Sequence, residues 1–179
     1  MHPARRRLAI MQLVGGPLVL ASYAYCILRF PDASAMMWGG VPDSLRPLYT
    51  AWMFVAAAGY FAYSNLFLRH ADPDRVRIFG RGYGLITLAY ALVLFPSAIW
   101  MPATKWLLDA PSPLRFWLMR IDLFAVATGS ILLLIAAIAI QPAPPRGVRL
   151  IAILGAIGFC VQTVLLDALI WPALFPIRG

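Results

Sequence analysis

The chain has 179 residues, of which 62% are hydrophobic and only 12% are charged, and its mean hydropathy is +0.80. Since a soluble domain carries about 25% charged residues, this composition excludes a soluble protein and predicts an integral membrane protein. The formal net charge of +8 does not indicate a nucleic-acid partner, because basic loops facing anionic headgroups are ordinary in membrane proteins and no basic stripe interleaved with aromatic residues appears.

Five apolar runs are long enough to cross about 30 Å of hydrocarbon as helices, at roughly 20 residues each. In chain order they cover residues 8–28, 48–68, 83–102, 116–140 and 150–175. The first run is too long for the core of a signal peptide, which has about 7 to 15 residues, so we expect a retained helix. We therefore predict an all-α bundle of five transmembrane helices that forms a single domain over residues 1–179.

The basic residues indicate an orientation for this bundle. With the N-terminus inside, nine of the 15 lysines and arginines fall on the inner side and six on the outer side. Because basic loops favour the cytoplasmic face, we predict that the N-terminus lies inside and the C-terminus outside. We expect the membrane to be a bacterial inner membrane.

Two acids lie within the predicted spans. Asp122 and Asp167 lie about 9 and 12 Å below the outer ends of the fourth and fifth spans, at 1.5 Å per residue. Ionisable groups in hydrocarbon usually face a bundle interior or a wet cavity, which makes both acids candidates for function. The alternative is a structural ion pair with Arg46, Arg115 or Arg120 from a neighbouring helix end.

Helical spacing predicts which faces of the helices point inward. One stripe on the fifth span and one on the third have the required intervals of three and four; they consist of Cys160, Thr163, Asp167 and Trp171, and of Tyr83, Thr87, Tyr90, Leu94, Ser97 and Met101. Small residues in the other spans are expected to let helices approach closely; they are Gly15, Gly16, residues 56–59, Gly129 and Ser130.

The end of the third span suggests a pocket. Pro96 is expected to kink this helix and Pro102 to end it, which leaves Ser97 and freed carbonyl groups in need of partners. All six tryptophans of the chain lie on the predicted outer side, and Trp100 and Trp106 would flank the space. We predict a pocket open to the outer leaflet, capped by residues 29–47, for a flat apolar ligand that is either neutral or cationic.

The string Ser97-Ala98-Ile99-Trp100-Met101-Pro102 resembles the tryptophan-rich sensory proteins, also called translocator proteins. In that family the same place often reads Asn, two residues, Trp, one residue, Pro, so Ser97 stands at the Asn position. The pair Leu48-Tyr49, followed by Met53 and residues 56–58, also looks like the second helix of the family. The chain departs from the family at residues 42–47, which replace a Trp-Pro-rich approach, at the spacing from Tyr49 to Met53, which is one residue longer, and before Trp171, where a Pro-Tyr step is missing.

The resemblance implies a five-helix bundle, commonly a dimer, that binds porphyrins, sterols or similar flat ligands beneath the first outer loop. It assigns five residues to the pocket, which are Trp38, Arg46, Tyr49, Trp100 and Trp171. We add Ser97 by its position in the motif, Thr163 by its place on the inward stripe, and Asp122 and Asp167 as polar contacts peculiar to this sequence. The expected partners are membrane lipids and a hydrophobic small molecule, with no cofactor.

Two other classes of function stay open. The first is a membrane enzyme for a lipid or isoprenoid in which Asp122 and Asp167 act as general acid and base. No histidine lies near this pair, and no spacing of metal ligands appears. The second is an accessory or assembly subunit of a larger membrane complex, whose outer tryptophan cluster docks a partner or a pigment.

Overall fold

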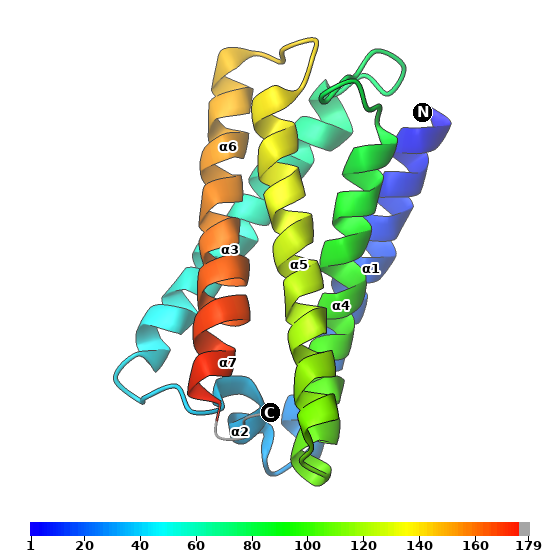
Figure 1. Ribbon diagram of the computed structural model, residues 1–179. Helices are drawn as coiled ribbons and strands as arrows, with labels where there is room; N and C mark the ends of the chain where they lie inside the picture. Colours follow the sequence, from blue (N-terminus) through cyan, green and yellow to red (C-terminus); the bar gives the residue numbers. More distant parts are fainter. Residues whose placement is uncertain (176–179) are drawn as a thin grey trace.

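The computed structural model describes residues 1–175, which are predominantly helical (Figure 1). The elements are α1 (Pro3–Arg29), α2 (Ala33–Trp38), α3 (Arg46–Asn65), η1 (Leu66–His70), α4 (Gly84–Asp109), α5 (Pro113–Ala139), α6 (Arg146–Cys160), η2 (Val161–Ile170) and α7 (Trp171–Leu174). Extended pairing within residues 1–175 is limited to isolated bridges, Arg77 with Gln141 and Ile78 with Arg81.

These elements form five long helices and the short α2. The π-helix η1 continues α3, and α6 continues through the π-helix η2 into α7. All five are long and apolar enough to cross a membrane, and large apolar side chains such as Leu13, Phe54 and Phe61 are exposed on the outside. This confirms the predicted all-α fold with five helices that are long and apolar enough to span a membrane. The orientation of the termini stays a prediction, and Arg178, one of the six basic residues on the predicted outer side, lies outside the described residues.

The two ends of the bundle differ in their connections (Figure 1). At one end, which we call the α2 end, lie α2 and the turn at residues 110–112. At the other end, the N-terminal end, lie the start of α1 and the connections at residues 71–83 and 140–145. Every tryptophan of the chain belongs to the half of the bundle near α2, because each precedes or follows a connection at that end.

Small residues let the helices pack in close pairs. α1 packs against α4, which also packs against α5, while α3 packs against α6. A Cβ atom on Gly59 of α3 would lie 2.2 Å from the carbonyl oxygen of Gly155 in α6, and one on Gly15 of α1 would lie 2.9 Å from Leu94 of α4. These contacts confirm the packing role predicted for Gly15 and Gly59. Gly16 differs, since a Cβ atom there would meet nothing within 4 Å.

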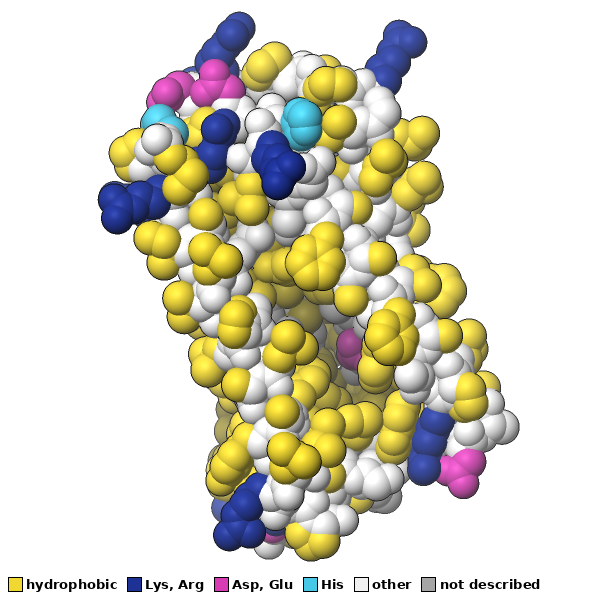
Figure 2. Space-filling view, turned by 180° about the vertical axis from the view of Figure 1, so that it is seen from behind, with side chains coloured by type: hydrophobic (Ala, Val, Ile, Leu, Met, Phe, Trp, Pro, Cys, Tyr) yellow, Lys and Arg dark blue, Asp and Glu magenta, His cyan; other side chains and the backbone are white. Residues whose placement is uncertain are grey.

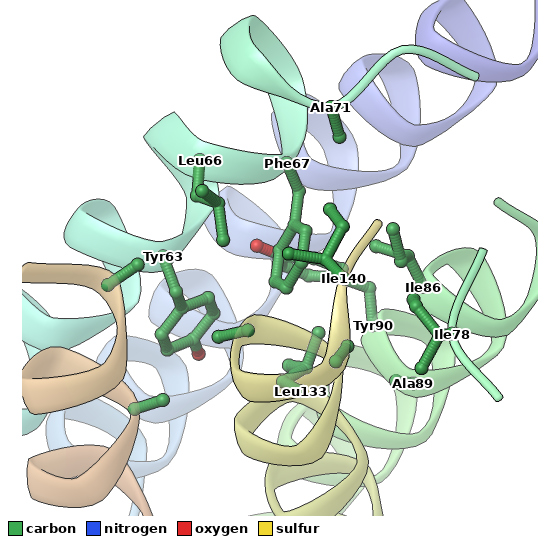
Figure 3. Packing of buried hydrophobic residues seen from close by; sticks show 14 of the residues in the cluster. Tyr63, Leu66, Phe67, Ala71, Ile78, Ile86, Ala89, Tyr90, Leu133 and Ile140 are labelled. Carbon is green, nitrogen blue, oxygen red and sulfur yellow. The ribbon is translucent and has the colours of Figure 1, made fainter. Parts of the chain in front are cut away.

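A buried aromatic core fills the N-terminal half of the bundle (Figure 3). Tyr63 and Tyr90 are fully buried there, with ring centroids 5.9 Å apart. The Tyr90 hydroxyl lies 2.7 Å from the Ser64 hydroxyl, and the Tyr83 hydroxyl donates to the Phe67 carbonyl at 2.9 Å. Dense packing of this kind leaves little room for a ligand in this half.

The structure corrects the predicted end of the third span. α4 continues through both Pro96 and Pro102 to Asp109, so Pro102 does not end the helix. A proline within a helix removes one backbone hydrogen bond, but the residues beyond it still form their own bonds, as hydrocarbon requires. In addition, the Thr104 hydroxyl donates to the Trp100 carbonyl at 2.9 Å. The first helix also begins earlier than predicted, at Pro3.

Candidate functional site

A hollow opens into the side of the bundle in the half near α2 (Figure 2). Figure 2 views the molecule from behind, so α1 and α3 are in front, and the hollow lies between them. Its walls are hydrophobic, and an acidic side chain is visible at its bottom. The only acids of the chain within the spans, away from their ends, are Asp122 and Asp167.

The packing of the helices explains why the hollow has this shape. α1 packs against α4 and α3 packs against α6, so the two front helices belong to different pairs. Near the N-terminal end, η1 contacts α1, and the Arg5 guanidinium donates to the Ala71 carbonyl at 2.8 Å. At the other end α2 contacts both α1 and α4. The gap is therefore closed at both ends and open between α1 and α3.

Aromatic side chains from three elements meet in this half of the interior. Trp100 of α4 contacts Tyr23 of α1 with ring centroids 5.6 Å apart, and it contacts Trp171 of α7 at the same distance, edge to face. Trp171 in turn packs on Phe175, with ring centroids 4.5 Å apart. The structure thus brings Trp100 and Trp171, both assigned to the predicted pocket, into contact with each other, and their rings present flat apolar surface.

The segment around α2 caps this end of the bundle. The indole N–H of Trp171 donates to the Met37 carbonyl at 2.9 Å, and a Cβ atom on Gly40 would lie 1.8 Å from the Leu174 carbonyl oxygen. Gly39, with a φ of 53°, adopts a backbone conformation that favours glycine. The close fit means that only glycines allow the segment to lie this near the end of α7.

Trp38 and Arg46 belong to this cap. The Arg46 guanidinium lies 5.7 Å from the centre of the Trp38 ring and forms an ion pair with Asp43 at 2.7 Å. Its Nε also donates to the Val41 carbonyl at 3.3 Å. The charge of Arg46 is thus satisfied within the cap, and this residue supports the roof of the site.

The two acids have different surroundings. Asp122 is half-buried on the same stripe of α5 as the buried Met119 and Val126, and its Oδ2 atom is buried without a hydrogen-bond partner. Asp167 accepts a hydrogen bond from the Gln162 side-chain nitrogen at 2.7 Å. Asp167 is thus hydrogen-bonded within its own helix, whereas the Oδ2 atom of Asp122 has no partner among the described residues.

The alternative of a structural ion pair is wrong for the described residues. No described lysine or arginine has a nitrogen within 4.0 Å of Asp122 or Asp167, because each predicted partner is engaged elsewhere. Arg120 lies over the Trp117 ring, 4.9 Å from its centre. Arg115 lies 4.2 Å from the centre of the Trp106 ring and donates to the Trp106 carbonyl.

A π-helix explains how Gln162 reaches Asp167. Residues five apart in an α-helix point about 140° away from each other, since each turn has 3.6 residues. η2 instead has the i to i+5 hydrogen bonds of a π-helix, which place residues five apart about one turn above each other. Gln162 and Asp167 therefore share a face. Segments of π-helix are rare and frequently occur at functional sites.

Other predicted residues have structural contacts. Thr163 donates to the Ser130 hydroxyl of α5 at 2.7 Å, and Tyr49 donates to the Leu166 carbonyl at 3.5 Å. Ser97 is half-buried on α4 and makes no side-chain hydrogen bond to the described residues. The structure thus gives Thr163 and Tyr49 roles in joining helices, beside the site.

Sequence reasoning missed Tyr23 and Gln162. Gln162 is a polar amide in an otherwise apolar helix, and this could have marked it as a candidate. The spacing of an α-helix, however, places Gln162 and Asp167 on different faces. Tyr23 lies near the end of a helix where an interfacial tyrosine is ordinary, so nothing in its local sequence distinguishes it.

A second concave surface lies between α1 and α4 on the outside of the bundle. This groove of about 420 Å³ is lined by Arg7, Ile10, Met11, Val14, Gly15, Leu18 and Phe95. Apart from Arg7 its lining is apolar, so it suits a lipid chain and offers no set of polar groups for recognition. Among residues 1–175 no three His, Cys, Asp or Glu side chains come together as a metal site.

Comparison with protein-family models, characterised proteins and solved structures finds no match to this chain. The resemblance to the tryptophan-rich sensory proteins therefore stays a prediction, and the function must be argued from the site.

Proposed function

We propose that the protein binds a flat hydrophobic molecule in the hollow between α1 and α3, for sensing, sequestration or transport. The class includes tetrapyrroles, sterols and other isoprenoid-like molecules. The observation that carries the proposal is the hollow itself, open to the side, with an acid at its bottom (Figure 2), in the half of the bundle where aromatic rings from α1, α4 and α7 contact one another.

The aromatic contacts favour a flat ligand. Trp100 meets Tyr23 and Trp171 at angles of 60° and 71° between the ring planes. Rings tilted in this way present both faces and edges to a neighbouring space, and a planar molecule gains from stacking on the faces. Small-molecule sites are mostly apolar with a few placed polar groups, which is the composition found here.

Unpartnered polar atoms support binding over simple packing. The Trp100 indole nitrogen, the Asp122 Oδ2 atom and the Gln162 Oε1 atom are three of the ten buried side-chain atoms of the described residues that have no hydrogen-bond partner. Leaving a buried polar group unsatisfied costs about 1–3 kcal/mol, so such groups are uncommon in native proteins and call for an explanation. A ligand with complementary polar groups supplies one.

The orientation and the route of entry are part of the proposal. With the N-terminus inside, as the arginines indicate, the α2 end faces outward and the hollow opens to the outer leaflet. A hydrophobic molecule dissolved in that leaflet reaches the site between α1 and α3 without crossing the cap. This arrangement matches the pocket beneath the first outer loop that the family resemblance implies.

A second candidate is an accessory subunit of a membrane complex. Trp106 and Trp117 are 44% and 51% exposed, and each carries an arginine over its ring. These two tryptophan–arginine pairs near the α2 end could contact a partner protein as well as lipid headgroups.

Small molecules that co-purify with the protein test the proposal. The protein is extracted in a neutral detergent, its absorption spectrum is recorded, and an organic extract is analysed by mass spectrometry. The proposal predicts a stoichiometric flat hydrophobic compound, or uptake of protoporphyrin IX or cholesterol by the emptied protein. Neither a bound compound nor uptake, together with recovery in a larger complex, contradicts it and favours the accessory subunit. Turnover of an added lipid favours the alternative of an enzyme using Asp122 and Asp167.

A further inference from the structure

We propose that an anionic phospholipid binds on the outside of the bundle at the N-terminal end, with its phosphate at Arg6 and Arg7 and one acyl chain in the groove between α1 and α4. This inference goes beyond the proposed function. The lining of the groove includes neither Tyr23 nor Trp100, so the lipid site is separate from the hollow and either proposal can fail while the other stands.

The groove follows one face of α1 beside α4 (Figure 1). Its lining residues on α1 stand three, four, seven, eight and eleven positions after Arg7, which is the spacing of a single helical face; they are Ile10, Met11, Val14, Gly15 and Leu18. Phe95 of α4 forms the opposite wall. The two helices touch at Gly15, since a Cβ atom there would lie 2.9 Å from Leu94. The groove is therefore a channel along the seam of a packed helix pair.

The length of the groove matches one leaflet of a membrane. Leu18 is eleven residues beyond Arg7, or about 16 Å along α1 at 1.5 Å per residue. The hydrocarbon core of a bilayer is about 30 Å thick, so one leaflet contributes about half of that. An acyl chain whose headgroup lies at Arg7 can thus follow the apolar lining over the full depth of its leaflet.

The charged end of the groove continues into a second concave surface. This surface, of about 370 Å³, is lined by Met1, Pro3, Arg6, Arg7 and Ile10. It shares Arg7 and Ile10 with the groove. The groove alone has one charged residue, but together the two surfaces bring two guanidinium groups to one end of an apolar channel, and no acid lines either of them.

Both guanidinium groups are available to a ligand. Arg6 and Arg7 are exposed, and within residues 1–175 neither forms a side-chain hydrogen bond or an ion pair, whereas the neighbouring Arg5 donates to the Ala71 carbonyl. The planar guanidinium group matches the geometry of a phosphate and forms paired, charge-assisted hydrogen bonds with it. The head of the groove therefore suits a phosphate.

Charge selects an anionic lipid over the other possible occupants. A zwitterionic headgroup carries an ammonium group that two arginines repel, and a basic surface attracts anionic lipids. A second copy of the chain packed symmetrically on this groove would bring its own Arg6 and Arg7 to the same place, because a two-fold interface pairs the same patch from both subunits. An anionic phospholipid complements both the basic head and the apolar channel.

Two phospholipids with the same chains test the headgroup. Dioleoyl phosphatidylglycerol is anionic and dioleoyl phosphatidylcholine is zwitterionic. Each is titrated into the full-length protein in neutral detergent, after removal of co-purified lipid, and native mass spectrometry gives the affinity for the first bound lipid. We expect phosphatidylglycerol to bind about tenfold or more tightly, the scale expected for two arginines near a membrane surface. Equal affinities of the parent protein for the two lipids would overturn the inference.

A matched pair of double variants locates the headgroup. Arg6→Gln with Arg7→Gln should lower the affinity for phosphatidylglycerol about tenfold and change that for phosphatidylcholine less than about twofold. Arg69→Gln with Arg75→Gln is the control, because it removes the same charge from two exposed arginines at the same end that line neither concave surface. If both double variants lose affinity equally, the preference follows the total charge of this end and the inference is wrong.

A second pair of variants locates the acyl chain. Val14→Trp fills the groove and should weaken binding of phosphatidylglycerol about threefold or more, because the chain loses its contacts with the lining. Leu13→Trp, at a residue that is 74% exposed on α1 and outside the lining, should change the affinity less than twofold. A free anion needs only the arginines, so equal affinities of the two variants would show that no chain lies in the groove and would overturn the lipid assignment.

The same spectra report the oligomeric state. A dimer of the parent protein that Val14→Trp dissociates would assign the groove to a second copy of the chain and overturn the inference. An oligomeric state that Val14→Trp leaves unchanged, together with the preference for phosphatidylglycerol, supports a lipid in the groove.

Discussion

Trp100 and Trp117 show how two residues of one type differ in their surroundings. Both lie near the α2 end of the bundle, where an interfacial belt of tryptophan is ordinary. Trp117 is 51% exposed on α5, while Trp100 contacts Tyr23 and Trp171 and has a buried indole nitrogen without a partner. The difference arises from long-range contacts, and these decide which of the two residues belongs to the candidate site.

Tyr63 and Tyr90 provide a test of how much a hydrogen bond of a buried tyrosine hydroxyl contributes to stability. Both side chains are fully buried (Figure 3). The Tyr63 hydroxyl has no partner, so Tyr63→Phe should leave the free energy of unfolding unchanged or raise it. Tyr90→Phe leaves the Ser64 hydroxyl without its partner and should lower that free energy by about 1 kcal/mol. Unfolding by SDS in mixed micelles measures both; an equal loss in the two variants would show that the Tyr63 hydroxyl is bonded after all.

The acids show how much of the candidate site the sequence contains. Asp122 and Asp167 are recognisable because charges are rare within apolar spans. Their partners are not, since the hydrogen bond from Gln162 to Asp167 depends on a π-helix that has no clear sequence signal. The predicted ion pairs to Arg115 and Arg120 fail for another reason, because these arginines stack on Trp106 and Trp117, nine and three residues away.

At the scale of the helices, the contact between α3 and α6 depends on two glycines. A Cβ atom on Gly59 would lie 2.2 Å from the backbone oxygen of Gly155, which cannot move aside as a flexible side chain can. Gly59→Ala should therefore lower the free energy of unfolding by about 1–3 kcal/mol, the usual range for overpacking.

Gly16→Ala is the matched control for this prediction. A Cβ atom at Gly16 meets nothing within 4 Å, and alanine is the better helix former, so stability should stay the same or rise slightly. Thermal unfolding in detergent compares the two variants. A loss at Gly16 as large as at Gly59 would mean that the helix pair does not depend on close approach.

The helices themselves were largely predictable. Their number and approximate positions follow from apolar length alone, and the five spans agree with the sequence-based ranges. Pro102 was misjudged because proline usually ends helices in soluble proteins, whereas α4 continues to Asp109. In hydrocarbon a single lost hydrogen bond is less costly than an unfolded segment, which exposes every backbone group.

The hollow is a property of the whole molecule. It exists because α1 pairs with α4 and α3 pairs with α6, which leaves α1 and α3 apart in the half near α2 (Figure 2). These pairings join residues far apart in the chain, so periodicity within single helices cannot predict them. The sequence predicted a pocket at this end of the bundle, but not the side of the bundle on which the hollow opens.

The orientation of the bundle is tested by labelling from outside the cell. A cysteine introduced by Ser112→Cys, in the turn between α4 and α5, should react with an impermeant thiol reagent in intact cells. One introduced by Gly147→Cys, at the start of α6, should react only after the membrane is made permeable. The native Cys26 and Cys160 lie within helices and are replaced by alanine in the background. The opposite pattern of labelling would reverse the predicted orientation.

The most direct test of ligand binding in the hollow is a fluorescence titration with protoporphyrin IX on the parent protein, Trp100→Phe and Trp117→Phe. A lost aromatic contact costs about 0.5–1.5 kcal/mol beyond the area buried, which is roughly two- to tenfold in affinity. We predict that Trp100→Phe weakens binding by this factor and that Trp117→Phe, on the exposed face of α5, leaves it unchanged. Equal affinities of all three proteins for the porphyrin would contradict binding between α1 and α3.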